Sequence, residues 1–134
     1  MAVVLITDMD AVREARWRDV LARALPEETV VAAGDVDATG LAPAAFDVAV
    51  AANPPAATLA RFPALGFVQS LWAGVEPLVD HPALPASAPL ARLIDPAMAG
   101  AMAEAVTAHV MALHRDHPVV GRAQAERRWA PAAV

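Results

Sequence analysis

The stretch 46–75, FDVAVAANPPAATLARFPALGFVQSLWAGV, decides the fold class. It contains two mostly apolar segments that we predict to be strands, 46–52 and 66–71, separated by Asn53, two prolines and a segment long enough for a short helix. Short, mostly apolar segments bounded by turn residues are typical of strands in a buried sheet. Two such strands joined by a crossover predict a parallel pair in an α/β protein.

The residues on either side continue this pattern. Segments 2–6 (AVVLI) and 29–33 (TVVAA) predict two further buried strands, and the segment between them carries apolar residues three and four positions apart, as an amphipathic helix does. Asp8 and Asp10 can cap that helix. A short fifth strand is expected over 90–94. The sequence therefore predicts an α/β fold with a flavodoxin-like, doubly wound parallel sheet of five strands.

The pattern changes after the fifth predicted strand. Asp95 can cap a helix, and the proline after it fits a first helical turn, so we expect a long helix to about His114. Arg92 and Asp95 are expected to form an ion pair as well as this cap. A further short helix is expected over 121–129, and the last residues resemble a linker. We therefore expect the chain to end within a connection, as a truncated protein does.

The composition excludes several classes of protein. The chain has 134 residues, a formal charge of −5 and no cysteine, which removes disulfides and thiolate sites. Its cations are scattered arginines, and an acidic chain of this kind gains little from phosphate backbones, so we expect no nucleic-acid partner. No apolar run approaches about 18 residues, and no basic segment with an apolar run opens the chain. We expect a cytoplasmic protein without a membrane partner.

The sequence lacks the residues that three kinds of functional site require. The six glycines lie too far apart for a dinucleotide-binding or phosphate-binding loop. A response-regulator receiver domain has a similar layout, but its chemistry needs a carboxylate after the third strand and a lysine, whereas this chain has Asn53 there and no lysine. His109, His114 and His117 diverge, since a step of five residues turns a helix by roughly 140°. We expect no metal site.

The turn after the fourth predicted strand is the candidate site. Ligands of open α/β sheets bind beyond the carboxyl ends of the strands. The small residues of Trp72-Ala73-Gly74-Val75 leave backbone N–H groups that can face an anion, and a helix expected to start at Gly74 or Val75 would add its dipole. An ordinary tight turn is the alternative.

Three segments resemble the D-isomer-specific 2-hydroxyacid dehydrogenases, in particular the glyoxylate/hydroxypyruvate reductase A type. Segment 54–79 (PPAATLARFPALGFVQSLWAGVEPLV) is similar to the family pattern PxLxxVxxLGAGVD. Segment 89–116 (PLARLIDPAMAGAMAEAVTAHVMALHRD) resembles the next block, and 122–131 (RAQAERRWAP) resembles the segment before the cofactor domain. The chain departs from the pattern at Trp72, where the family has glycine, and at Glu76, where it has aspartate.

The resemblance implies the N-terminal part of an NAD(P)H-dependent 2-oxoacid reductase, which converts glyoxylate or hydroxypyruvate to glycolate or glycerate. Residues 1–95 would form the substrate-binding domain, and 96–134 a hinge or dimerisation helix and an arm that starts a truncated cofactor domain. NADP or NAD would bind the complete enzyme and not this part alone. The family's catalytic residues lie downstream, so we expect no catalytic residue in this chain and no activity from it.

The resemblance also assigns binding roles. The amides of Ala73, Gly74 and Val75 would hold the substrate carboxylate, and Trp72 would narrow the substrate mouth or pack on the surface. Met102 would contact the nicotinamide or pack in the core. Trp129 would reach the active site of a partner subunit, or pack in an interface, with the helix and arm 96–129 forming a homodimer. The alternative is a free-standing, non-catalytic module that binds a small acid or dimerises.

Overall fold

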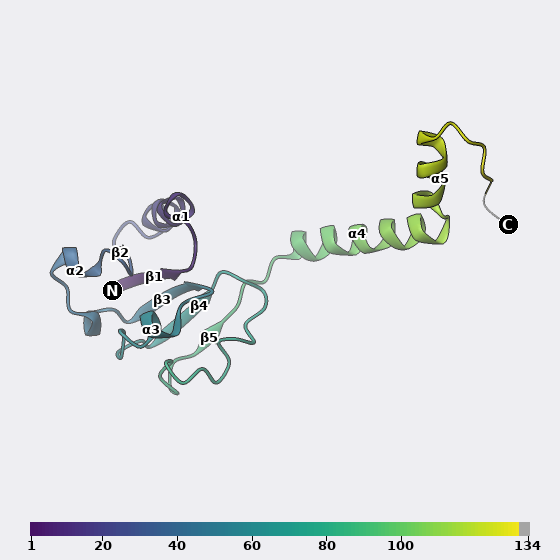
Figure 1. The fold of residues 1–134 in the computed structure, drawn as a ribbon. Helices are drawn as coiled ribbons and strands as arrows, with labels where there is room; N and C mark the ends of the chain where they lie inside the picture. Colours follow the sequence, from purple (N-terminus) through teal and green to yellow (C-terminus); the bar gives the residue numbers. More distant parts are fainter. Residues whose placement is uncertain (132–134) are drawn as a thin grey trace. The chain divides into compact units, whose positions relative to one another are not determined.

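The computed structural model describes residues 1–131 and divides into two compact units, Met1–Ile94 and a second that begins at Asp95. Figure 1 labels the α-helices and strands of both units. Those of the first unit are β1 Ala2–Thr7, α1 Ala11–Ala24, β2 Thr29–Ala32, α2 Val36–Thr39, the 3-10 helix η1 Pro43–Ala45, β3 Val48–Ala52, α3 Ala56–Leu59, β4 Phe67–Ser70 and β5 Leu90–Ala91. The second unit contains α4 Pro96–His114 and α5 His117–Ala125.

The five strands form one parallel sheet in the order β2-β1-β3-β4-β5 (Figure 1). This confirms the predicted α/β class and the five-strand parallel sheet. The order reverses between β1 and β3, which is the topological switch point of a doubly wound sheet. Because all strands run in the same direction, the turns after Thr7, Ala52 and Ser70 meet at one edge of the sheet. That edge is where a ligand site is expected.

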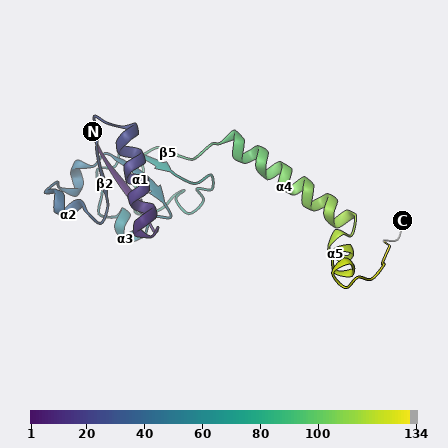
Figure 2. The same cartoon turned by 90° about the horizontal axis from the view of Figure 1, so that it is seen from above.

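Each face of the sheet carries its own core, because alternate residues of a strand point to opposite sides. On one face, the buried Val3, Leu5 and Val50 pack against Trp17 and Leu21 of α1, which lies across that face in Figures 1 and 2. The core on the other face is larger and includes residues from α2, α3 and the loops. Its fully buried valine, leucine, isoleucine and phenylalanine side chains each contribute about 1.5–3 kcal/mol. The two faces together hold the strands, and therefore the turns at their ends, in place.

Several element boundaries differ from the prediction. Phe46 precedes β3 instead of opening it: its N–H closes the η1 turn, and its ring packs edge-to-face on Phe62 with the ring centres 5.7 Å apart. The short second helix was predicted over 121–129, but α5 begins at His117. Pro118 lies in its first turn, where a missing N–H costs nothing. The last residues, 132–134, lie outside the described part of the chain.

The second unit consists of two helices. The Asp95 carboxylate accepts a hydrogen bond of 2.9 Å from the N–H of Ala97 and caps α4, as predicted. Asp116 has a left-handed backbone (φ 53°) between α4 and α5, which ends the first helix. The large apolar side chains of α4 are exposed, Met102 and Val106 among them. None of the described helices is both long enough and apolar enough to span a membrane.

Candidate functional site

The turn that follows β4 is fixed by a buried serine. Ser70 is 1% exposed, and it is the one buried polar side chain among residues 1–131. Its hydroxyl accepts a hydrogen bond from the N–H of Trp72 (3.0 Å) and donates one to the carbonyl of the same residue (3.2 Å). Leu71 still pairs with β3, through its N–H and the carbonyl of Ala51 (2.8 Å). The chain therefore leaves the sheet at Trp72 with a set direction.

The three residues after Trp72 present unbonded amides. Within residues 1–131, no backbone or side-chain oxygen accepts a hydrogen bond from the N–H of Ala73, Gly74 or Val75. The N–H of Trp72 is already used by Ser70. Gly74 is exposed and its two neighbours are half-buried. Three consecutive N–H donors at the carboxyl edge of the sheet are therefore accessible to an anion.

The end of β5 supports this turn from the other side. The guanidinium of Arg92 donates to the carbonyl of Ala73 (3.3 Å), and the N–H of Leu93 donates to the carbonyl of Trp72 (3.1 Å). The sequence predicted an ion pair between Arg92 and Asp95, and this prediction is wrong for the described residues. The guanidinium of Arg92 bonds to the turn instead. The carbonyls of Trp72 and Ala73 are therefore occupied, whereas the N–H groups of 73–75 remain unbonded.

The helix that was expected to start at Gly74 or Val75 is absent. The carbonyl of Val75 accepts hydrogen bonds from Leu78 (2.8 Å) and Val79 (3.0 Å), and the turn goes no further. Prolines at 77 and 82 cannot donate the N–H groups that a helix needs. A helix dipole requires aligned peptide groups, so it contributes little here. Anion binding at this turn would depend on the individual amides.

A carboxylate oxygen already occupies the space beside Gly74. A Cβ placed on Gly74 would lie 3.0 Å from Oε2 of Glu76. Glu76 is exposed, so this side chain can move away. The space next to the free amides therefore has room for a carboxylate oxygen, and the residue at 74 must be small to keep that room.

A cavity of about 250 Å³ adjoins the same turn. It lies between the ends of β3 and β4 and the loop that follows β4. Trp72, whose side chain is 43% exposed, lies on its wall. The lining residues are Asn53, Pro54, Ser70, Trp72, Gly74, Pro77, Leu78 and His81. Gly74 belongs both to this cavity and to the row of free amides.

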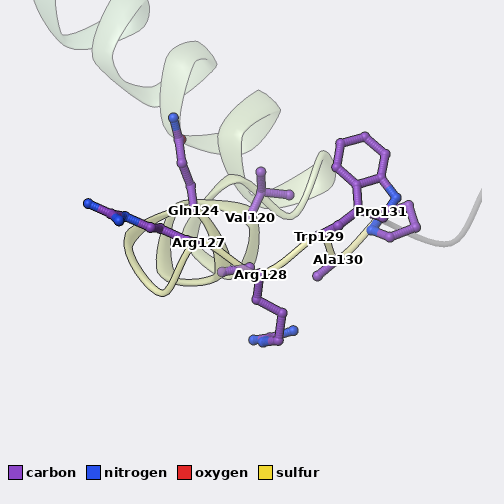
Figure 3. A pocket seen from close by; sticks show the side chains of 8 residues that line it. Val120, Gln124, Arg127, Arg128, Trp129, Ala130 and Pro131 are labelled. Carbon is purple, nitrogen blue, oxygen red and sulfur yellow. The ribbon is translucent and has the colours of Figure 1, made fainter.

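The other two predicted site residues belong to the second unit. Met102 lies on α4 and is 60% exposed. Trp129 follows α5, is 90% exposed, and lines a separate cavity of about 540 Å³. Figure 3 shows its ring beside Pro131, with Gln124 reaching into view from α5. The structure thus groups 72–75 in one turn, while Met102 and Trp129 remain predictions from the resemblance.

The first unit does not fit a dinucleotide. The turn after β1, where such a fold would hold a pyrophosphate, is Asp8-Met9-Asp10. It has no glycine, and its two carboxylates would repel phosphate. Within the described part of the chain, no three His, Cys, Asp or Glu side chains lie close enough to hold a metal ion. Within residues 1–131, the amides of 73–75 are left as unbonded donors at the carboxyl edge of the sheet.

Comparison with known proteins adds the following findings. No protein-family model matches the chain, and no curated protein gives a match. Among solved structures, a D-isomer-specific 2-hydroxyacid dehydrogenase from Xanthobacter autotrophicus Py2, in complex with NADPH and MES, is 36% identical over 98% of this chain, with a TM-score of 0.74. An NADPH-dependent glyoxylate/hydroxypyruvate reductase from Sinorhizobium meliloti, in complex with NADP and sulfate, shares the fold with a TM-score of 0.77 and 23% identity over 98% of this chain.

These structures are much longer than the chain. It covers 41% of the Xanthobacter protein and 40% of the Sinorhizobium protein. A D-isomer-specific 2-hydroxyacid dehydrogenase family protein from Klebsiella pneumoniae 342 matches 99% of this chain over 40% of its own length, with a TM-score of 0.77 and 24% identity. The similarity therefore extends over nearly the whole of this chain and over less than half of each relative.

Proposed function

We propose that this chain, whose structural neighbours are D-isomer-specific 2-hydroxyacid dehydrogenases, supplies the carboxylate-binding part of an NAD(P)H-dependent 2-oxoacid reductase. The substrates proposed are glyoxylate and hydroxypyruvate, which would be reduced to glycolate and glycerate. The observation that carries the proposal is the row of three unbonded amides at Ala73, Gly74 and Val75. They lie at the edge of the sheet where this fold binds its ligands.

The amides would act by binding and orienting the substrate. A hydrogen bond from a neutral N–H to a carboxylate contributes roughly 1.5–3 kcal/mol, and two or three of them fix the direction of the acid. With its carboxylate held, the oxoacid has its keto carbon at a set distance from the turn. The cofactor of a complete enzyme supplies a hydride. No residue of this chain is assigned to proton transfer.

The second unit is proposed to form a homodimer in the cytoplasm. Most faces of α4 carry exposed apolar side chains, Met102, Val106 and Val110 among them. A surface of this kind is typical of a helix that packs against another subunit or domain. In such an assembly Met102 would contact the nicotinamide, and Trp129 would reach the partner's active site.

A free-standing module is the second candidate function. One observation favours it: the free amides, Ser70 that fixes them and Arg92 that supports them all belong to the first unit. Such a module would bind a small acid, or dimerise, without catalysing a reaction.

Amide NMR of the purified chain tests carboxylate binding. Glyoxylate and oxamate are titrated against the 15N-labelled protein, with oxamide as the uncharged control. We expect the amide resonances of Ala73, Gly74 and Val75 to move with both acids and to stay in place with oxamide. Acids that leave these three resonances unmoved would remove the basis of the proposal.

A further inference from the structure

We propose that Arg92 is a positioning residue of the acid site: by holding the carbonyl of Ala73, its guanidinium directs the N–H of Gly74 toward a bound carboxylate and makes it a stronger donor. This inference rests on the proposed function, because it takes the amides of 73–75 to bind the acid. It adds a charged side chain to a site that is otherwise formed by backbone groups.

Each carbonyl of this turn shares a rigid plane with the N–H of the next residue. A trans peptide bond is planar, so its C=O and N–H groups point in opposite directions. None of the peptide bonds among the described residues is cis. The carbonyl of Ala73 and the N–H of Gly74 therefore turn together. A bond that holds this carbonyl on one side of the turn fixes the N–H on the other side.

The two carbonyls at the start of the turn have different partners. The carbonyl of Trp72 accepts hydrogen bonds from the hydroxyl of Ser70 (3.2 Å) and from the N–H of Leu93 (3.1 Å). The carbonyl of Ala73 accepts a bond from the guanidinium of Arg92 (3.3 Å), and among residues 1–131 no backbone N–H donates to it. The direction of the next N–H, that of Gly74, therefore depends on Arg92.

Arg92 also brings a positive charge to the turn. A guanidinium stays protonated in proteins. Among residues 1–131, no carboxylate lies within ion-pair distance of Arg92. A cation at a carbonyl oxygen draws electrons through the peptide bond, and hydrogen bonds joined in this way strengthen one another. The N–H of Gly74 should therefore donate to an anion more strongly than it would if the carbonyl had a neutral partner.

A purely structural role for Arg92 is the alternative. The same bond ties the residue after β5 to the loop after β4, and a tie of this kind would hold the two segments together and do nothing else. The two roles differ in what they require. Positioning by charge requires a cation at residue 92, whereas a tie requires only a donor. The bond is exposed, so its loss should leave the protein folded.

Three variants of Arg92 separate these roles. Arg92→Lys keeps the charge and a donor, Arg92→Gln keeps a donor without the charge, and Arg92→Met loses both. Arg61→Met is the matched control, because Arg61 donates to the carbonyl of Ala33 over the same 3.3 Å. Ala33 follows β2, which lies at the opposite edge of the sheet from β5. Urea unfolding checks that each variant is folded.

Amide NMR of the 134-residue protein gives two measurements for each variant, the amide resonances without ligand and the dissociation constant for glyoxylate. We expect Arg92→Met to bind glyoxylate about three- to five-fold more weakly, the effect that an exposed charge allows. Its Gly74 amide proton should move upfield more than that of Ala73, because the carbonyl of Trp72 keeps its own partners. Arg92→Lys should bind more tightly than Arg92→Gln, and Arg61→Met should match the wild type.

A folded Arg92→Met protein that binds glyoxylate as tightly as the wild type overturns the inference and leaves the proposed function standing. Equal affinities for Arg92→Lys and Arg92→Gln, or equal shifts at Ala73 and Gly74, also overturn it, because a structural tie predicts both. A wild type whose amides at 73–75 do not respond to glyoxylate overturns this inference and the proposed function together.

Discussion

Replacing Gly74 with alanine tests the amide turn without unfolding the protein. Gly74 does not have a positive φ, so alanine can adopt its backbone conformation. The new Cβ would meet nothing but Oε2 of Glu76 at 3.0 Å and its Cδ at 4.0 Å. This side chain is exposed and can swing away at small cost. Since Gly→Ala also restricts the unfolded chain by about 0.4–1 kcal/mol, we expect the free energy of unfolding to change by less than about 1 kcal/mol.

Unlike the stability, the binding of glyoxylate should be weakened strongly by Gly74→Ala. The methyl group of Gly74→Ala takes the space that a carboxylate oxygen occupies now, so an incoming acid would lose at least one hydrogen bond to the turn. Loss of one such bond corresponds to about 1.5–3 kcal/mol. Because about 1.4 kcal/mol is a factor of ten, we expect the dissociation constant for glyoxylate to rise roughly 10- to 100-fold.

The assay combines urea unfolding, followed by tryptophan fluorescence, with the glyoxylate titration by NMR. Gly66→Ala is the matched control, because Gly66 lies just before the other end of β4 and its Cβ would meet only the carbonyl of Asp47 at an ordinary 3.7 Å. The control should keep both stability and binding. A folded Gly74→Ala protein that binds glyoxylate as tightly as the wild type would refute the role given to this turn.

Four further outcomes are expected. Ser70→Ala should lower the free energy of unfolding by about 1–3 kcal/mol in urea melts, since the N–H of Trp72 loses its partner and its carbonyl keeps only the bond from Leu93, whereas the exposed Ser87→Ala should change little. Asp95→Ala should destabilise α4 by about 1 kcal/mol, seen as lost helicity in circular dichroism; unchanged helicity would contradict the cap. Val106→Asp should raise the dissociation constant of a dimer at least about ten-fold in sedimentation velocity, and an unaffected dimer would exclude α4 from the interface. The purified chain should not oxidise NADPH in the presence of hydroxypyruvate, and measurable absorbance loss would prove that expectation wrong.

The fold could be predicted from sequence because most residues of its strands are apolar. Segments 2–6 and 29–33 lie within one residue of the strands that the structure contains, since a strand buried on both faces forms a nearly continuous apolar run. The predicted ends of the strands and helices were wrong where tertiary contacts decide at which residue an element begins. Phe46 is apolar like its neighbours, yet it packs on Phe62, outside the ladder.

The candidate site was only partly predictable. Small residues at 73–75 indicated free amides, and the structure has them unbonded. No helix follows these residues because the prolines at 77 and 82 cannot donate the N–H groups that a helix needs. The effect of these prolines depends on the path of the loop, which the sequence does not specify. Nothing in the sequence indicated that Ser70 fixes the turn, because a single serine can do so only once it is buried at the end of the strand.

The cap of α4 has a chemical consequence. Asp95 is followed by Pro96, and this is the one Asp–Pro peptide bond of the chain. Such bonds hydrolyse selectively in dilute acid, because the aspartyl side chain attacks its own carbonyl and the proline nitrogen is a good leaving group. Both residues of the scissile bond are exposed, and the bond lies at the start of the second compact unit. Mild acid should therefore release 1–95 from 96–134 without a protease, which provides the sheet and the helices as separate samples.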